Sequence, residues 1–362
     1  MRPARVLLSA DALRHNFARV RSFAPLAQVM AVVKANGYGH GLSWTARTLR
    51  EADAFGVASV EEGAALRDAG IRQPVVLLEG FFHPEELPAL VRFRLDAVVH
   101  HESQLWDLEH APPLDEPVDV WLKIDTGMHR IGFNPDIVPE VVRRLKTCMA
   151  AGRVRVMSHF PSADNRFDTT APYQVRQFEE LSQNLNVERS LANSAGVVNW
   201  PSSHFEWVRP GIMLYGASPM IGFTAKELDL RPVMTLASEL IAINARRKGD
   251  TIGYGGDFIC PEDMPVGVVA IGYGDGYPRH VPPGTPVLLN GKRVPIVGRV
   301  SMDMITVDLR TQPEARVGDR VVLWGEGLPV DEIAALAGTV SYELLCQVTA
   351  RVPRVERNAS GE

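Results

Sequence analysis

Residues 29–34 read VMAVVK, an apolar run of strand length that ends in a lysine and is followed by ANGYGHG at residues 35–41. Seven further runs of similar length follow before residue 212, separated by longer segments. Several are nearly free of polar residues, which is typical of strands buried on both faces. The eight runs are VMAVVK (29–34), AFGVAS (54–59), VVLLEG (75–80), LDAVVH (95–100), VDVWLKID (118–125), VRVMSH (154–159), ERSLAN (188–193) and FEWVRPG (205–211).

The segments between the runs have helical periodicity. In residues 135–152 apolar side chains recur on one helical face, and Gly152 stands where a C-capping glycine is expected. The apolar positions of this stripe are Val138, Val141, Val142, Leu145 and Met149. We therefore expect one helix to occupy most of this segment.

Eight strand–helix units in sequence favour a (β/α)8 barrel, with an open doubly wound sheet as the alternative. After about residue 230, short Val/Ile runs alternate with Gly, Pro and Asp turns, a pattern typical of antiparallel strands. The NGK sequence at 290–292 is a hairpin signal. We expect an α/β chain with a TIM-like barrel over residues 1–230 and a mostly antiparallel β domain over residues 231–362. The first few residues are free to pair with the second domain.

Composition excludes several classes of protein. The 362 residues carry 38 Lys+Arg against 43 Asp+Glu, and a net charge of −5 argues against binding nucleic acid by phosphate neutralisation. The three cysteines are far apart and form no CxxC motif, which predicts reduced thiols in a cytoplasmic protein rather than a disulfide framework or zinc ribbon. No stretch approaches the roughly 18–20 apolar residues of a membrane span, and the N-terminal apolar stretch is too short for a signal peptide.

Polar residues stand where several of the predicted barrel strands end. Active sites of such barrels lie at the carboxyl ends of the strands. The predicted strand ends therefore bring a set of polar side chains to one rim of the barrel. These residues are Lys34, Lys123, Asp125, His159, Asn193, Ser194 and Arg209.

Lys34 allows two interpretations. A lysine at the end of an apolar run is either a surface lysine with a buried stem or a Schiff-base lysine made nucleophilic by its surroundings. Three glycines in residues 37–41 let the backbone approach a ligand closely, which favours the second interpretation.

A phosphate site is the second feature of the predicted rim. Barrels commonly bind phosphate in the loops after the seventh and eighth strands, where Ser194 and Gly211 lie, although an ordinary helix cap also explains this serine. A Schiff-base lysine together with a phosphate site indicates pyridoxal phosphate, and a phosphosugar aldolase would satisfy the same pair of features. His159 is compatible with a core histidine whose hydrogen bonds are made within the protein. The scattered histidines show no spacing suited to a metal.

Seven motifs, in family order, resemble those of alanine racemases from about residue 11 to residue 350. The resemblance implies a pyridoxal-phosphate enzyme with a barrel, a C-terminal β domain and a homodimer with shared active sites. The complete set is more specific than any one member. The motifs are AVVKANGYGHG (31–41), KIDTGMHRIG (123–132), NSAG (193–196), VRPGIMLYG (208–216), GYGG (253–256), GYGDGYPR (272–279) and GRVSMD (298–303).

The resemblance also implies a role for individual residues. Lys34 matches the lysine that forms the aldimine with the cofactor, and Tyr254 matches a second catalytic base supplied by the partner subunit. Arg209 matches the arginine that faces the pyridine nitrogen, and His159 matches a histidine beside this machinery. The positions around the cofactor phosphate match Tyr38, Asn193, Ser194, Gly211, Ile212 and Tyr342.

Two further positions match contacts to the substrate, Met302 through its backbone and from the other subunit, and a third matches a modified lysine. Arg130 and Met302 match residues that hold the substrate carboxylate, and Lys123 matches a lysine often carbamylated in the family. The pKa of an ordinary tyrosine is about 10, so a base at position 254 needs nearby cations, for which we name His159 and Arg209.

The resulting expectation is a cytoplasmic alanine racemase that interconverts L- and D-alanine by a two-base mechanism and supplies D-alanine for peptidoglycan. The main alternative is a racemase that acts on another amino acid, such as serine, or on a broad range of amino acids. A related pyridoxal-phosphate amino-acid decarboxylase is a weaker alternative, because a cofactor-facing glutamate would suit it better than Arg209. A cofactor carrier without catalytic activity would not need Tyr254 or the second domain.

Overall fold

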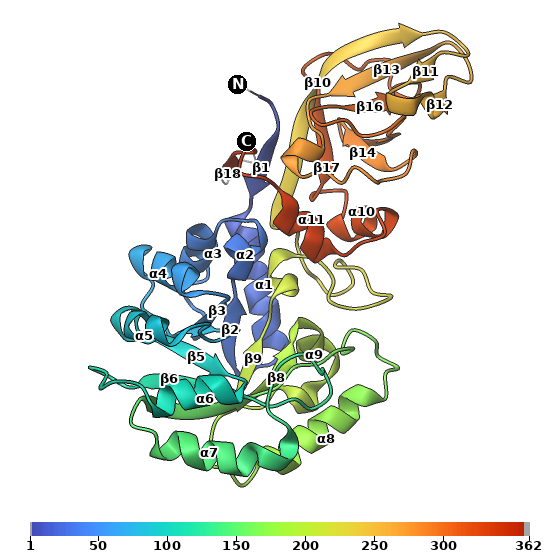
Figure 1. Ribbon diagram of the computed structural model, residues 1–362. Coiled ribbons are helices and arrows are strands. Elements are labelled where there is room, and N and C mark those ends of the chain that lie inside the picture. The colour runs from blue at the N-terminus through green and yellow to red at the C-terminus, as the bar shows by residue number, and fades with distance from the viewer. Residues whose placement is uncertain (1, 358–362) are drawn as a thin grey trace. The chain divides into compact units, whose positions relative to one another are not determined.

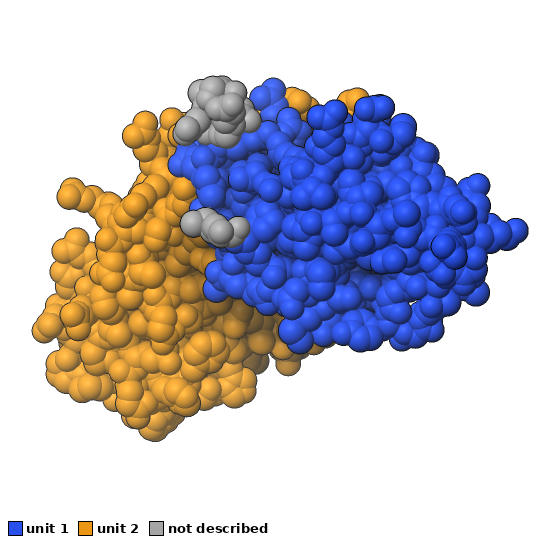
Figure 2. Space-filling model, turned by 90° about the horizontal axis from the view of Figure 1, so that it is seen from above, with its two compact units in different colours: residues 1–13, 215–217, 231–362 blue, residues 14–214, 218–230 orange. Residues whose placement is uncertain are grey.

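The computed structural model describes residues 2–357 and divides into two compact units, coloured separately in Figure 2. The barrel unit comprises residues 14–214 and 218–230. The β unit comprises residues 1–13, 215–217 and 231–362. No helix in the described part of the chain is long and apolar enough to cross a membrane.

The barrel unit contains eight parallel strands that close on themselves (Figure 1). Closure is made by β2 and β9, which pair Gln28 with Trp207 and Val29 with Val208. The predicted barrel is therefore confirmed, and the open sheet is excluded. The strands are β2 (Gln28–Val32), β3 (Ala54–Val57), β4 (Val75–Leu77), β5 (Leu95–Val99), β6 (Val118–Lys123), β7 (Ala151–Met157), β8 (Arg189–Asn193) and β9 (Trp207–Arg209).

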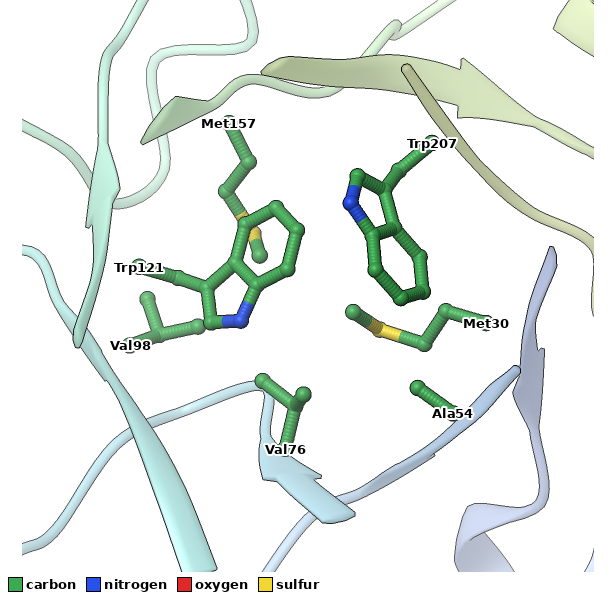
Figure 3. Close-up of a cluster of buried hydrophobic side chains, with 7 residues drawn as sticks. All are labelled: Met30, Ala54, Val76, Val98, Trp121, Met157 and Trp207. Atoms are coloured by element: carbon green, nitrogen blue, oxygen red, sulfur yellow. The ribbon is translucent and has the colours of Figure 1, made fainter. Parts of the chain in front are cut away.

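Large side chains from these strands fill the barrel interior, as Figure 3 shows. The Trp121 and Trp207 rings meet edge to face at 5.7 Å between centroids. Met30 and Met157 fill the space beside them, and all four side chains are at most 5% exposed. The interior is thus a packed core, which leaves the rim to carry the chemistry.

Helices lie around the outside of the strand ring (Figure 1). The α-helices are α1 (Ala10–Phe23), α2 (Lys34–Tyr38), α3 (Leu42–Thr48), α4 (Val60–Asp68), α5 (Leu87–Phe93), α6 (Glu102–Glu109), α7 (Val138–Thr147), α8 (Thr170–Ser182) and α9 (Ser194–Asn199). The 3-10 turns are η1 (Pro84–Glu86), η2 (Pro135–Ile137), η3 (Pro201–Ser203) and η4 (Ile212–Tyr215).

Helix α7 confirms most of the predicted stripe and corrects its end. Val138, Val141, Val142 and Leu145 are buried, but Met149 is 96% exposed and lies beyond the helix. Gly152 lies in β7 and is not a helix cap. A Cβ at position 152 would come within 2.6 Å of the Asp119 carboxylate, so a glycine is needed where β7 lies against β6.

A buried arginine is paired near the amino ends of strands β5 and β6. Arg155 of β7 lies 3.5 Å from Asp96, 3.4 Å from Asp119 and 2.7 Å from Glu188. Its guanidinium also lies over the Trp121 ring, 5.2 Å from the centroid. Burial raises the pKa of Asp96 to about 7, against the opposing effect of Arg155. Charge is therefore neutralised locally at this end of the barrel.

The β unit is mostly antiparallel, as predicted. Its main sheet has the order β15-β14-β17-β10-β1-β18, and β13 pairs with β10 and β16. Strand β1 pairs antiparallel with β10 and parallel with β18, so the N-terminal strand belongs to this sheet. The strands are β1 (Arg5–Leu8), β10 (Met234–Arg246), β11 (Thr251–Ile252), β12 (Phe258–Ile259), β13 (Met264–Val269), β14 (Pro286–Leu289), β15 (Lys292–Pro295), β16 (Ile305–Asp308), β17 (Arg320–Trp324) and β18 (Arg354–Glu356).

Two helices and two 3-10 turns complete the β unit. They are α10 (Val330–Leu336), α11 (Ser341–Gln347), η5 (Tyr254–Gly256) and η6 (Tyr273–Asp275). The predicted hairpin is confirmed, because Asn290 and Gly291 adopt φ values of +48° and +78° between paired strands β14 and β15.

Candidate active site

Lys34 begins a short left-handed turn directly after strand β2. Ala35, Asn36 and Gly37 adopt φ values of +54°, +55° and +61°. Such a conformation is costly for residues with a Cβ, so it indicates a functional constraint. The Lys34 side chain is 38% exposed, so it is only partly buried within this chain.

Polar contacts hold this turn in place. The Asn36 side-chain oxygen accepts a hydrogen bond from the Leu42 amide at 2.9 Å. His40 is fully buried, with Nδ1 2.9 Å from the Tyr38 carbonyl and 3.0 Å from the Gly37 carbonyl. A Cβ at Gly37 would lie 2.6 Å from the Thr45 hydroxyl. The ANGYGHG motif therefore fixes the backbone that presents Lys34 and Tyr38.

The loop after strand β6 places Lys123 and Arg130. It folds back so that the Phe133 amide donates to the Lys123 carbonyl at 2.9 Å. One carboxylate oxygen of Asp125 accepts the amides of Gly127 and His129, each at 3.0 Å. Burial alone would raise the pKa of Asp125, but these amides outweigh it and lower that pKa. Asp125 thus stays ionised and shapes the loop that exposes Arg130.

Lys123 has an unusual environment. Its residue is 6% exposed, and no group in residues 2–357 forms a hydrogen bond or ion pair with its amine. Burial, together with the charges of Arg209, Arg130 and Lys34, lowers the pKa of Lys123 well below its ordinary value. The amine therefore favours its neutral, nucleophilic form.

Arg209 is buried without a carboxylate partner in the described part of the chain. Its guanidinium donates to the Ser190 hydroxyl at 2.6 Å, to the Ser158 carbonyl and, more weakly, to the Leu191 carbonyl at 3.4 Å. Burial lowers the pKa of Arg209 to about 10, so the side chain remains a cation at neutral pH.

His159 lies against Arg209, with its Nδ1 3.4 Å from the guanidinium. Burial, followed by the charges of Lys123 and Arg209, lowers the pKa of His159 well below its ordinary value. A neutral Nδ1 can accept a hydrogen bond from the guanidinium. His159 therefore does not supply the positive charge we expected of it beside Tyr254, and Arg209 is the cation of that pair.

Ser194, Gly211 and Tyr38 form a compact polar cradle. The Ser194 Oγ accepts hydrogen bonds from the amides of Gly211 at 2.8 Å and Met213 at 3.4 Å. The hydroxyl proton of Ser194 therefore points away from these two amides. A Cβ at position 211 would lie 2.5 Å from the Tyr38 hydroxyl, so only glycine leaves room there. Asn193 is the N-cap of α9 and accepts the Gly196 amide at 2.9 Å, so Ser194 is not that cap. Ile212 is fully buried just after Gly211.

The barrel residues fit an anionic, phosphate-bearing group. Lys34, Arg130 and Arg209 all contribute positive charge to the surroundings of His159. Hydroxyl groups and a glycine cradle lie in the same unit. This donor set suits a phosphate and a second anionic oxygen, as in pyridoxal phosphate. Within residues 2–357, no group of three His, Cys, Asp or Glu residues could hold a metal ion.

The other three predicted site residues lie in the β unit, and each is exposed. Tyr254 is 68% exposed in η5, between glycines at φ +75° and +77°. Met302 is 52% exposed, and its carbonyl accepts the Gly274 amide at 2.8 Å. Tyr342 is 42% exposed on α11.

Sequence reasoning missed one charged residue of the barrel rim. The Glu79 carboxylate lies 3.5 Å from the Lys34 amine. Glu79 follows strand β4 in the run VVLLEG, so a search of every strand end for polar residues would have found it.

A closed barrel that carries a lysine after its first strand, a buried arginine and the Ser194–Gly211–Tyr38 cradle at its strand ends is typical of a cofactor-binding enzyme of the TIM-barrel class. A family model described as the alanine racemase N-terminal domain matches residues 8–219, and one described as the alanine racemase C-terminal domain matches residues 233–356. The chain belongs to the alanine racemase family, whose members are pyridoxal-phosphate-dependent isomerases.

Individual relatives agree over nearly the whole chain. An alanine racemase of Nitrosococcus oceani is 56% identical over 349 residues, covering 96% of this chain and 98% of the relative. One from Vibrio parahaemolyticus is 51% identical over 353 residues, covering 97% and 98%. The crystal structure of the biosynthetic alanine racemase from Pseudomonas aeruginosa has a TM-score of 0.96 at 44% identity, covering 99% of this chain and all of that one.

The lowered pKa of His159 predicts a pH-dependent stability. Below about pH 6.5 the unfolded chain takes up a proton at this histidine while the folded chain does not, so stability falls as pH falls. Replacing His159 by Asn should flatten this fall by up to about 1.4 kcal/mol per pH unit. Urea unfolding of the cofactor-free protein between about pH 7.5 and about pH 5.5 measures the slope. His83, which is exposed, provides the control His83→Asn, and equal slopes in both variants would refute the assignment.

Proposed function

We propose that this chain interconverts L-alanine and D-alanine, with pyridoxal phosphate bound at the carboxyl end of the barrel. The observation that carries the proposal is the placement of the Lys34 amine in a site rich in cations, beside the Tyr38–Gly211 cradle. Family membership supports the same activity. When bound, the cofactor supplies an electron sink that makes the Cα proton of the substrate acidic.

The chain's own residues bind and orient that group. Arg209 would face the pyridine nitrogen and, as a cation with a pKa of about 10, would donate a hydrogen bond there without giving up its proton. His159 stays neutral beside it. Lys34 would supply the covalent attachment. The residues that would hold the phosphate are Tyr38, Asn193, Ser194, Gly211, Ile212 and Tyr342.

Racemisation needs a base on each face of the substrate carbon. We assign Lys34 Nζ to the proton of D-alanine and the hydroxyl of Tyr254 from the partner subunit to that of L-alanine. Each returns a proton when the reaction runs the other way. The exposure of Tyr254 in this chain suits a side chain that acts in a neighbouring subunit.

Two more residues hold the substrate carboxylate. Arg130 is exposed in the loop after strand β6, and the Met302 backbone would approach from the partner subunit. Carbamylation of Lys123 would turn a buried neutral amine into an anion able to hold Arg130. Its lowered pKa supports this modification, because CO2 reacts with the neutral amine and a proton is released.

The same proposal includes an oligomeric state and a cellular location. The working unit is a homodimer in which the β unit of each chain lends Tyr254 and Met302 to its partner's barrel. We place it in the cytoplasm, where its three free thiols are kept reduced, and assign its D-alanine to peptidoglycan synthesis.

Replacing Lys34 by Ala should abolish racemisation and the near-visible absorbance that the bound cofactor shows in the wild type. The reason is that the variant lacks both the attachment point and one base. A panel of amino acids, including serine, is incubated with wild type and variant, with and without added cofactor, and read by chiral chromatography. The exposed Lys146 provides the control Lys146→Ala. Retained activity in Lys34→Ala would remove Lys34 from this role, and a wild type that prefers serine would change the substrate.

Replacing Tyr254 by Phe should impair proton abstraction from L-alanine far more than from D-alanine, because only one base is lost. Initial rates of deuterium incorporation at Cα in D2O, measured separately for each enantiomer, report the two faces. Tyr173→Phe, which changes an exposed tyrosine of α8, is the matched control. Equal losses for both enantiomers would contradict the two-base assignment.

Carbamylation of Lys123 can be observed directly. Wild-type protein incubated with 13C-bicarbonate should show a protein-bound carbamate resonance by 13C NMR. Lys123→Gln should lack it, because the buried neutral amine is gone. Lys146→Gln, which changes an exposed lysine, should keep it. A resonance that survives in Lys123→Gln, or that is missing in the wild type, would exclude this modification.

A further inference from the structure

Glu79 is a carboxylate at the barrel rim with no role in the proposed function. It follows strand β4, and its Oε1 lies 3.5 Å from Lys34 Nζ. The two side chains are 45% and 38% exposed, so the pair sits at the open end of the barrel rather than in its core.

The backbone that carries Glu79 is held firmly. His100 Nε2 donates to the Glu79 carbonyl at 3.1 Å. Gly80 adopts φ +73°, and a Cβ there would lie 2.1 Å from the Val98 carbonyl and 2.6 Å from Gln104 Nε2. Gln104 in turn accepts the His100 amide at 2.9 Å and donates to the Phe81 carbonyl at 2.9 Å. This close packing fixes the position from which Glu79 reaches Lys34.

Neighbouring acids are engaged with backbone amides. Glu62 accepts the Ala58 amide at 2.9 Å and the Asn36 amide at 3.4 Å. Asp125 accepts the amides of its own loop. Within residues 2–357, the Glu79 carboxylate forms its one ion pair with Lys34.

Other cations act on the same part of the rim as Lys34. The charges of Arg130 and Arg209, like that of Lys34, lower the pKa values of Lys123 and His159, and both of those groups favour their neutral forms. Placing a further positive charge among them is unfavourable unless a carboxylate offsets it. Glu79 is placed to supply that negative charge.

We propose that Glu79 is a positioning residue that pairs with the Lys34 ammonium, both before the cofactor is attached and after Lys34 has taken a proton from the substrate. The second half rests on the proposed function. In that step the Cα–H bond breaks, an N–H bond forms on Lys34 Nζ, and the electron pair stays on the substrate and the bound cofactor. The new positive charge then lies beside the Glu79 carboxylate.

The first test uses the cofactor-free protein and does not depend on activity. An amine-acylating reagent labels neutral lysines, and peptide mass spectrometry measures labelling of Lys34 against pH. In Glu79→Gln the pH midpoint for Lys34 should fall by up to about 0.7 unit, which is about a fivefold faster labelling below the midpoint. Labelling of the exposed Lys146 serves as the internal reference.

Glu85→Gln is the matched control, since Glu85 is an exposed glutamate of the neighbouring turn η1. It should leave the Lys34 midpoint where the wild type has it. A role in folding alone would not move this midpoint. An unchanged midpoint in Glu79→Gln, or the same shift in Glu85→Gln, would overturn the proposal.

The second test uses the loaded enzyme. Glu79→Gln should slow initial deuterium exchange at Cα of D-alanine by up to about fivefold and leave exchange from L-alanine unchanged, because only Lys34 gains charge in the first case. Equal effects on both enantiomers would contradict the proposed pairing. If the wild type racemised nothing, the proposed function would fail, while the labelling experiment would still decide whether the pair exists.

Discussion

The buried positive charge of Arg209 is the constraint around which the rim of the barrel is organised. The guanidinium has no carboxylate partner among the described residues and relies on Ser190, Ser158 and Leu191. Those oxygens come from β8, which pairs with β9, and from the residue that follows β7, which pairs with β8. A cation fixed in this way favours the neutral forms of His159 and Lys123. Burial is the largest cause of both shifts, and the Arg209 charge acts in the same direction, so the two together lower the pKa values of these neighbours.

Much of the architecture could be predicted because it depends on local patterns. Apolar runs of strand length located all eight barrel strands, and the Asn-Gly pair located a hairpin. The end of α7 could not be predicted in the same way. Gly152 resembles a helix cap in sequence, but the approach of Asp119 from a neighbouring strand is what requires a glycine there. Contacts between strands distant in sequence leave no local signal.

In the candidate site, too, some features follow from local sequence patterns and others depend on contacts between distant residues. The strand ends indicated Lys34, Lys123, His159 and Arg209, and the structure groups them electrostatically. The sequence did not indicate the protonation states, because these depend on burial and on summed charges rather than on residue type. His159 is the clear example, since a histidine expected to be a cation is held neutral by its neighbours. Glu79 was overlooked because a glutamate after a strand has many ordinary explanations.

The two ends of the barrel each contain a buried arginine, and the two arginines have different partners. This difference distinguishes the end that serves stability from the end that serves function. Arg155 is surrounded by Asp96, Asp119 and Glu188, so its charge is balanced by groups of the chain itself. Breaking such a buried pair would leave an uncompensated charge, which makes that end structural. Arg209 has dipoles and hydroxyls but no acid within the described residues, and the cations near it add to the imbalance. A folded chain tolerates this excess only if the dipoles are well placed, and it gains a site where an anion is bound without first displacing an internal partner. The uncompensated positive charge at the carboxyl end of the barrel thus favours an anionic ligand there.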